Sequence, residues 1–245
     1  VNGAKTIVEA LCDHPDIKAV AFVGSSNVAK IVYNRCSQNS KRSLCLGGAK
    51  NHMIVVPDAD TDSTAKGLLA SSMGSAGQRC MAASVAVGVA NIDHIIEQLV
   101  EEAKNFKLGV DMGTIISKNA LDRITGYIDE AEKMGAKILV DGRDISPPVE
   151  YENGYWLGAT ILDGIDPEWP SAKEEIFGPV LSIIRSDTIE EAMKIENNNP
   201  YGNAAAVFTT SGQIAKVVSE KASAGMVGIN IGVPVPRDPY SFGGR

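Results

Sequence analysis

Long apolar runs are missing from this chain of 245 residues, and no stretch approaches the roughly 20 apolar residues that a membrane-spanning helix requires. Clusters of lysine and arginine are missing as well, and the formal net charge is −7. Nucleic acids and anionic membranes are bound through concentrated positive charge. We therefore expect neither a nucleic-acid partner nor a membrane partner.

Cysteine and histidine are too scattered for a metal centre or a disulfide framework. Cys12, Cys36, Cys45 and Cys80 are separated by 24, 9 and 35 residues, which matches neither paired zinc ligands nor a dense set of disulfides. The three histidines form no His-x-x-x-His or His-Cys pair. We predict no metal site and a reducing compartment. The first residues lack a basic, apolar leader, so we expect the chain as given to carry no targeting signal.

The rest of the composition is typical of a globular protein, with 44% hydrophobic and 22% charged residues. Helical and extended patterns alternate along the chain, which predicts an α/β fold with a parallel-rich sheet. We expect strands at 19–23, 53–56, 84–89, 137–140, 180–184, 205–208 and 226–230. We expect Asn2 to cap a helix that runs through about Leu11, and further helices over 27–38, 60–71, 92–106, 119–134, 189–196 and 213–222.

Cys80 is the strongest candidate for a catalytic residue. It lies in Gly-Gln-Arg-Cys-Met-Ala (77–82), after a run of small and hydroxyl-bearing residues, and Arg79 adds a positive charge beside it. Such surroundings favour an attacking thiolate over a thiol packed in a core. Taken alone, the pattern also fits a free cysteine on a loop, so its interpretation depends on the other motifs.

A second candidate site follows the predicted strand 19–23. Gly24 and Ser25 lead into the helix 27–38, where unpaired backbone N–H groups and the helix dipole attract a phosphate. An unoccupied helix N-cap explains the same residues equally well.

Six ordered motifs resemble those of the aldehyde dehydrogenase superfamily. Beside the cysteine motif they are Phe-Val-Gly-Ser-Ser (22–26), Leu-Gly-Gly-Ala-Lys-Asn (46–51), Glu-Ile-Phe-Gly-Pro-Val (175–180), Asn-Pro-Tyr-Gly (199–202) and Ser-Phe-Gly-Gly (241–244). Two strings, Gly-Ala-Lys-Asn-His and Gly-Gln-Arg-Cys-Met-Ala, resemble in particular the CoA-acylating branch that acts on methylmalonate semialdehyde.

This resemblance implies an aldehyde-dehydrogenase-like α/β fold in two parts. Residues 1–44 would be the end of a Rossmann-like NAD-binding domain. Residues 45–245 would be a catalytic domain with a parallel-rich, three-layer sheet, truncated at its C-terminal end. The chain would then be a C-terminal half, without the upstream strands that hold most of NAD and without the asparagine that helps to bind the oxyanion.

The resemblance also implies roles for matching residues. Cys80 would attack the aldehyde, so that hydride can leave to NAD and a thioester remains. Cofactor contacts would come from Gly24, Ser25, Leu46, Glu175 and Phe177, with Glu175 holding the nicotinamide ribose.

Three further residues would face the substrate. Arg79 would bind the carboxylate of a semialdehyde acid through its guanidinium group, and Asn230 and Phe242 would shape the aldehyde entry. A structural ion pair is the alternative for Arg79, and closure of turns is the alternative for the other two.

One departure from the family pattern predicts the acyl acceptor. Hydrolytic members carry a glutamate just before the Gly-Gly pair, where it activates water, but this chain has Cys45 or Leu46 there, and neither is a general base for water. A thioester that survives water would pass to coenzyme A. The expected products from methylmalonate or malonate semialdehyde are propionyl-CoA or acetyl-CoA and CO2.

Two alternatives remain open. One is a hydrolytic NAD(P)-dependent aldehyde dehydrogenase whose base comes from elsewhere, and the other is a non-catalytic fragment, which is what we expect of the 245-residue polypeptide by itself. For the full-length form, the resemblance implies a homodimer or homotetramer in the bacterial cytoplasm or the mitochondrial matrix.

Overall fold

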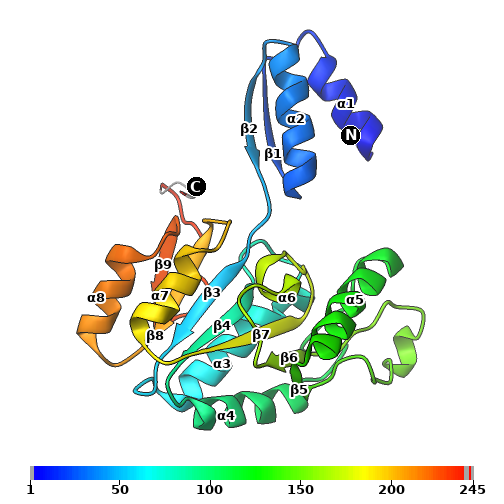
Figure 1. Ribbon diagram of the computed structural model, residues 1–245. Helices are drawn as coiled ribbons and strands as arrows, with labels where there is room; N and C mark the ends of the chain where they lie inside the picture. The colour runs from blue at the N-terminus through cyan, green and yellow to red at the C-terminus, as the bar shows by residue number, and fades with distance from the viewer. Residues whose placement is uncertain (1–2, 240–242, 244–245) are drawn as a thin grey trace. The chain divides into compact units, whose positions relative to one another are not determined.

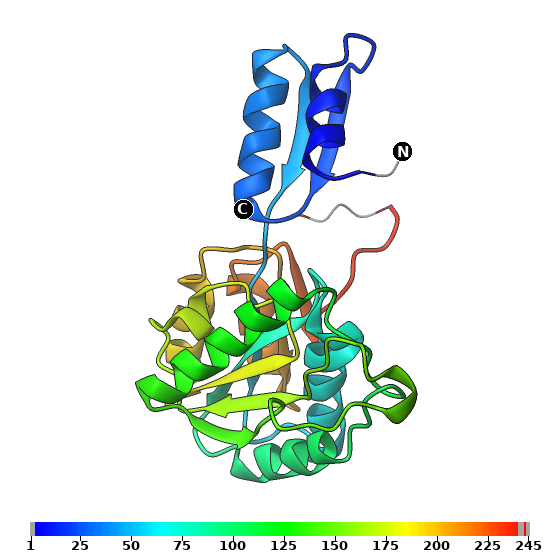
Figure 2. The same cartoon turned by 90° about the vertical axis from the view of Figure 1, so that its right-hand side faces the viewer.

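The computed structural model describes residues 3–239 and Gly243. The chain divides into two compact units, Val1–Gly48 and Ala49–Arg245. The elements of each unit are labelled in Figure 1, and Figure 2 gives a second view.

The first unit is a helix followed by a right-handed βαβ motif. Its elements are α1 (Lys5–Asp13), β1 (Ala19–Val23), α2 (Ser26–Gln38) and β2 (Arg42–Leu46). The two strands are parallel, with Phe22 opposite Cys45, and alternate residues of each strand pack on the helices around Cys12, Val32 and Cys36. Parallel strands end at the same edge of a sheet, so the segments that follow Val23 and Leu46 lie side by side.

The second unit contains a seven-stranded sheet with the order β5-β6-β7-β4-β3-β8-β9. All neighbouring pairs are parallel except β5 and β6, which are antiparallel. The strands are β3 (Asn51–Val55), β4 (Ala83–Val89), β5 (Lys137–Val140), β6 (Thr160–Asp163), β7 (Val180–Ser186), β8 (Ala204–Phe208) and β9 (Met226–Ile229).

Helices cover both faces of this sheet and make it the middle of three layers (Figures 1 and 2). The connection from β3 to β4 and the connection from β7 to β8 run in opposite directions along the sheet, so right-handed crossovers place their helices on opposite faces. The helices are α3 (Thr61–Met73), η1 (Gly74–Gly77), α4 (Asp93–Lys104), α5 (Lys118–Met134), η2 (Val149–Tyr151), α6 (Pro170–Lys173), α7 (Ile189–Asn197) and α8 (Gly212–Lys221).

The central strands form the core of the unit. Every residue of β3 and β8 is buried, because helices cover both faces of a parallel sheet and leave no solvated side. Among the residues that the structure describes, no helix combines the length and the apolar composition needed to cross a bilayer.

Most predicted elements are confirmed, with ends that differ by about two residues or fewer. The first helix begins at Lys5 with Ala4 in the N-cap position, while Asn2, the predicted N-cap, lies outside the described residues. Strands β2 and β6 and the short helix α6 were not predicted. Strand β2 alternates exposed and half-buried residues and contains Arg42 and Ser43, so it shows no apolar run.

Gly77 is the glycine on which the packing of two loops depends. Its φ is +65°, and a Cβ on it would lie 2.0 Å from the carbonyl oxygen of Gly178. We predict that Gly77→Ala lowers the free energy of unfolding by about 2 kcal/mol or more, since strain and overlap add. Urea unfolding followed by circular dichroism measures the change.

Gly126→Ala is the matched control, because Gly126 lies in α5 and a Cβ there would meet nothing within 4 Å. This second variant should gain about 0.5–1 kcal/mol through helix propensity. Equal unfolding midpoints for the two variants would contradict the importance of the Gly77 contact.

Candidate active site

Cys80 lies on a strained connection between α3 and β4, which we call the cysteine loop (residues 74–82). Ser75, Ala76 and Gly77 have φ values of 54°, 53° and 65°. L-residues with a side chain avoid this left-handed region at a cost of roughly 1–2 kcal/mol each, so the rest of the fold must stabilise the turn. The strained residues Ser75 and Ala76 lie five and four positions before the predicted nucleophile.

Two asparagine side chains hold the cysteine loop by its main chain. Asn51 Nδ2 donates hydrogen bonds to the carbonyl oxygens of Cys80 and Ala82, both at 2.8 Å. Asn203 Nδ2 donates to the same Cys80 carbonyl at 3.0 Å. Asn51 begins β3 and Asn203 immediately precedes β8, its neighbour in the sheet. The sheet therefore fixes the backbone of Cys80 through groups other than its thiol, which is partly buried.

A small cavity joins the cysteine loop to residues 174–179, which we call the glutamate loop. Its lining includes four of the predicted site residues: Arg79, Cys80, Glu175 and Phe177. Phe177 has a φ of 53° and is 39% exposed, so this aromatic residue does not belong to the core. Residues almost a hundred positions apart in the sequence thus share one cavity.

Glu175 is held in this cavity by a neighbouring main-chain group. Its Oε1 accepts a hydrogen bond from the N–H of Ala49 at 3.0 Å. Burial raises the pKa of Glu175, while the Ala49 hydrogen bond and the charges of Lys50 and Arg123 act in the opposite direction. The preceding Glu174 is exposed, so adjacent carboxylates occupy different environments.

Arg79 is turned toward the end of α3. Its Nη2 donates to the carbonyl oxygens of Ala70 and Ser71 at 3.1 and 2.9 Å, and its buried Nε has no hydrogen-bond partner. The guanidinium group lies against Gly74, where a Cβ would be 2.7 Å from Nη2. Among the described residues no ion pair involves Arg79. Its predicted contact with a substrate carboxylate stays a prediction, and the structure gives it a helix-capping role as well.

Asn230 completes the pairing of β8 with β9. Its Oδ1 accepts from the N–H of Thr209 at 2.8 Å and its Nδ2 donates to the carbonyl of Thr209 at 2.9 Å. The side chain thus imitates a strand residue, which favours the turn-closing alternative for Asn230. Phe242, the other residue predicted to shape the aldehyde entry, lies outside the described residues.

The three remaining predicted residues lie in the first unit, at the carboxyl ends of its strands. The N–H of Gly24 donates to the carbonyl of Leu46 at 3.2 Å. Ser25 occupies the N-cap of α2, but its hydroxyl makes no capping hydrogen bond. Instead, the hydroxyl of Ser26 accepts from the N–H of Gly48 at 3.1 Å.

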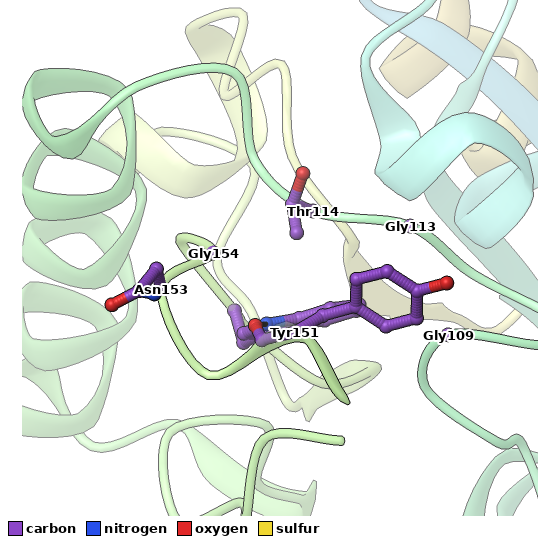
Figure 3. A pocket seen from close by; sticks show the side chains of 7 residues that line it. Gly109, Gly113, Thr114, Tyr151, Asn153 and Gly154 are labelled. Carbon is purple, nitrogen blue, oxygen red and sulfur yellow. Dashed lines mark hydrogen bonds between the residues drawn. The ribbon is translucent and has the colours of Figure 1, made fainter. Parts of the chain in front are cut away.

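A second, more open cavity of about 550 Å³ is lined by Gly109, Gly113, Thr114, Tyr151, Asn153, Gly154 and Trp156 (Figure 3). Its rim is tied to the cysteine loop, because Gln78 donates to the carbonyl of Thr114 at 3.1 Å and accepts from the N–H of Ile116 at 2.9 Å. No residue that the sequence analysis proposed for the site lines this cavity.

Comparison with known proteins decides the family. The aldehyde dehydrogenase family model matches residues 1–245. The chain belongs to that family.

Individual members of the family are similar to this chain over its whole length. It is 44% identical over 250 residues to the acylating, mitochondrial methylmalonate-semialdehyde/malonate-semialdehyde dehydrogenase of Rattus norvegicus, and covers 46% of that protein. It is 42% identical over 252 residues to malonate-semialdehyde dehydrogenase of Pseudomonas aeruginosa, and covers 50% of it. All of this chain is covered in both cases. The chain thus spans about half the length of the curated relatives it matches.

Solved structures agree with the sequence relatives. Methylmalonate-semialdehyde dehydrogenase of Oceanimonas doudoroffii superposes with a TM-score of 0.96 at 43% identity, over 100% of this chain and 52% of the other. An NAD complex from Sinorhizobium meliloti, provisionally named as the same enzyme, gives 0.95 at 44% identity, over 100% and 51%. The α/β fold with a largely parallel sheet is therefore that of the aldehyde dehydrogenases.

In this aldehyde dehydrogenase chain, sequence reasoning missed the residues that support the cysteine loop. Asn51 belongs to a motif that was used only for the resemblance, and Asn203 belongs to none. Two buried titratable residues were missed as well: burial lowers the pKa of Lys50 to about 7 and that of His52 to about 4. No group of three or more acidic, cysteine or histidine side chains suited to a metal occurs within the described part of the chain.

Asn51 offers a direct test of the loop anchor. We predict that Asn51→Leu, which removes both hydrogen bonds, destabilises the protein by about 1–3 kcal/mol and speeds the reaction of Cys80 with iodoacetamide. The exposed Asn119→Leu should change neither quantity. Peptide mass spectrometry measures the rate at Cys80 separately from the other cysteines, and equal rates in the two variants would argue against the anchor.

The burial of Lys50 predicts how the stability of the protein depends on pH. Its pKa is lowered from 10.5 to about 7 in the folded protein, so the unfolded chain binds one more proton between these values and wild-type stability rises with pH. Below about pH 7 the destabilisation is fully present. Lys50→Met should therefore be more stable than wild type near pH 7, by a margin that shrinks toward pH 10. Urea unfolding at several pH values tests this, and a constant margin would refute it.

Proposed function

We propose that this chain supplies the catalytic part of an NAD-dependent, CoA-acylating dehydrogenase of methylmalonate or malonate semialdehyde. The observation that carries the proposal is the partly buried thiol of Cys80, on a strained and doubly anchored loop, in one cavity with Glu175. In this proposal residues 1–44 end an NAD-binding domain and residues 45–245 form the catalytic domain. The boundary between the compact units, after Gly48, lies four residues further along.

Cys80 is the proposed nucleophile. Its sulfur bonds to the aldehyde carbon, and the carbonyl oxygen becomes an oxyanion that the backbone N–H of Cys80 is placed to stabilise in this family. Loss of hydride from the same carbon leaves a thioester on Cys80. The bond between the substrate carboxylate and the neighbouring carbon breaks to release CO2, and that carbon takes up a proton from solvent. The thiolate of CoA bonds to the acyl carbon and displaces the Cys80 thiolate. NAD, when bound, supplies the hydride acceptor.

Each unit, taken by itself, has residues that suit part of a dinucleotide. At the strand ends of the first unit, a Cβ on Gly47 would lie 2.8 Å from Ser26 Oγ, so this close approach requires glycine. Gly24 and Ser25 lead there into α2, whose first N–H groups suit a phosphate. Leu46 is the apolar neighbour at the same edge. In the second unit, the half-buried Glu175 has a carboxylate that suits ribose hydroxyls, and the exposed Phe177 of the same cavity supplies an aromatic side chain.

CoA is favoured over water as the acyl acceptor because of residues 45 and 46. Cys45 packs against the small core of the first unit, and Leu46 closes β2 by accepting a hydrogen bond at its carbonyl. Neither side chain can take a proton from water at neutral pH. The rat relative is named as an acylating enzyme, which supports the same choice.

Assembly and location are also proposals. We propose a homodimer or homotetramer, supported by the edge position of β9, where Ile229 is 43% exposed. The relatives include mitochondrial and bacterial proteins, which supports a mitochondrial matrix or bacterial cytoplasmic location. Sedimentation of the complete natural protein checks the assembly.

The complete natural protein, mixed rapidly with methylmalonate semialdehyde and NAD, tests the chemistry. We expect about one NADH per Cys80 in a burst that stalls, and continuous turnover once CoA is added. Cys80→Ala should abolish the burst. Continuous NADH formation without CoA would instead support the hydrolytic alternative, and turnover by the 245-residue chain alone would contradict the fragment interpretation.

Substitutions at Arg79 distinguish a role in substrate recognition from a role in helix capping. If it binds the substrate carboxylate, Arg79→Leu should raise KM for methylmalonate semialdehyde by about 10–100-fold more than KM for propanal, which lacks the carboxylate. Arg79→Lys keeps the charge and should lie between. Equal changes for both substrates would leave Arg79 with the capping role alone.

A further inference from the structure

Lys50 is the exceptional charged residue of the second unit. It is 1% exposed, and among the described residues no other lysine or arginine is buried. Its Nζ has no hydrogen-bond partner. Burying an unpaired ammonium group is costly, so a protein that keeps one gains something else from it.

The neighbours of Lys50 in the chain are the two residues that hold the Cys80 cavity. Ala49 donates its N–H to Glu175, and Asn51 donates its side-chain amide to the Cys80 carbonyl. The main chain of Lys50 is fixed as well, because Asn199 Nδ2 donates to its carbonyl oxygen. The main chain of Lys50 is therefore held in place between two residues that line the cavity.

The charges around Lys50 are predominantly acidic. The carboxylates of Glu175 and Glu174, both from the glutamate loop, favour its charged form and only partly offset its burial.

Four other titratable groups face this cluster. The hydroxyl of Tyr127 on α5 donates to Glu174, and Arg123 on α5 donates to the Glu175 carbonyl at 3.4 Å. Burial and both glutamates raise the pKa of Tyr201, and Lys50 adds to the lowering of the pKa of His52 on β3. The Lys50 amine, whose pKa burial lowers, thus interacts with a carboxylate whose pKa burial raises.

We propose that Lys50 is a positioning residue whose buried amine keeps the Glu175 carboxylate ionised and directed into the Cys80 cavity for a ligand with neighbouring hydroxyl groups. The inference rests on the proposed function, in which that ligand is the ribose of NAD. A ribose that covers Glu175 removes the carboxylate from water and strengthens its attraction to Lys50. Lys50 then takes up a proton when NAD binds near neutral pH.

The coupling of the two side chains can be measured without any ligand. In the chain labelled with 13C at glutamate side chains, the signal of Glu175 is assigned by its loss in Glu175→Gln and is followed against pH. Lys50→Met, which removes the charge and keeps the volume, should move the Glu175 titration to higher pH. Lys118→Met removes an exposed lysine and should leave it unchanged. Superimposable titrations in wild type and Lys50→Met would overturn the proposal.

Calorimetry of NAD binding to the complete natural protein tests the proton uptake. The heat of binding is measured near pH 7.5 in buffers of different ionisation enthalpy, which gives the number of protons taken up. Wild type and Lys118→Met should take up a fraction of a proton on binding NAD, and Lys50→Met should take up none. The Kd for NAD should rise by up to about tenfold in Lys50→Met. Identical proton counts in wild type and Lys50→Met would overturn the linkage. Failure of NAD to bind wild type would instead refute the proposed cofactor, and the titration of Glu175 would still decide the coupling to Lys50.

Discussion

The contact between the cysteine loop and the glutamate loop is the constraint on which the site depends. Only a glycine at position 77 lets the backbone approach the carbonyl of Gly178, and this approach brings Cys80 and Glu175 to one cavity. The left-handed turn that makes the approach is unfavourable by itself. Asn51 and Asn203, both attached to central strands, offset that strain through the Cys80 carbonyl. The sheet therefore positions the predicted nucleophile through its main chain and not through its thiol.

The same sheet explains how charge is tolerated inside the second unit. Strand β3 is buried along its whole length, yet Lys50 and His52 lie at its start. Burial lowers the pKa of both, so near neutral pH the histidine is uncharged and the lysine is near the midpoint of its titration. A buried group that changes charge near neutral pH influences nearby carboxylates far more than a surface lysine, since solvent screens it little. The charge of the buried Lys50 therefore affects the ionisation of Glu175, although the two residues are far apart in the sequence.

Much of the fold could be predicted because a parallel sheet covered on both faces produces continuous apolar strands, as in β3, β4 and β8. Strand β2 could not, because one of its faces is exposed and carries Arg42 and Leu44 alternately with half-buried residues. In the candidate site, motif positions predicted Cys80 and Glu175, which line one cavity in the structure. Asn203 has no motif, and its role depends on a hydrogen bond across 123 residues that only the tertiary structure creates.

Arg79 and Asn230 show where motif reasoning stops. Each was predicted from its position to contact substrate, and each makes local hydrogen bonds that a protein without any substrate would also need. For Asn230 both polar atoms of the side chain bind the main chain of Thr209, so a substrate could gain a polar contact only at the expense of the β8–β9 pairing. Arg79 differs, because its Nη2 alone caps α3 and a guanidinium group has five donors. Helix capping and carboxylate binding are therefore compatible in one side chain, and the fixed Nη2 would orient the remaining donors in advance.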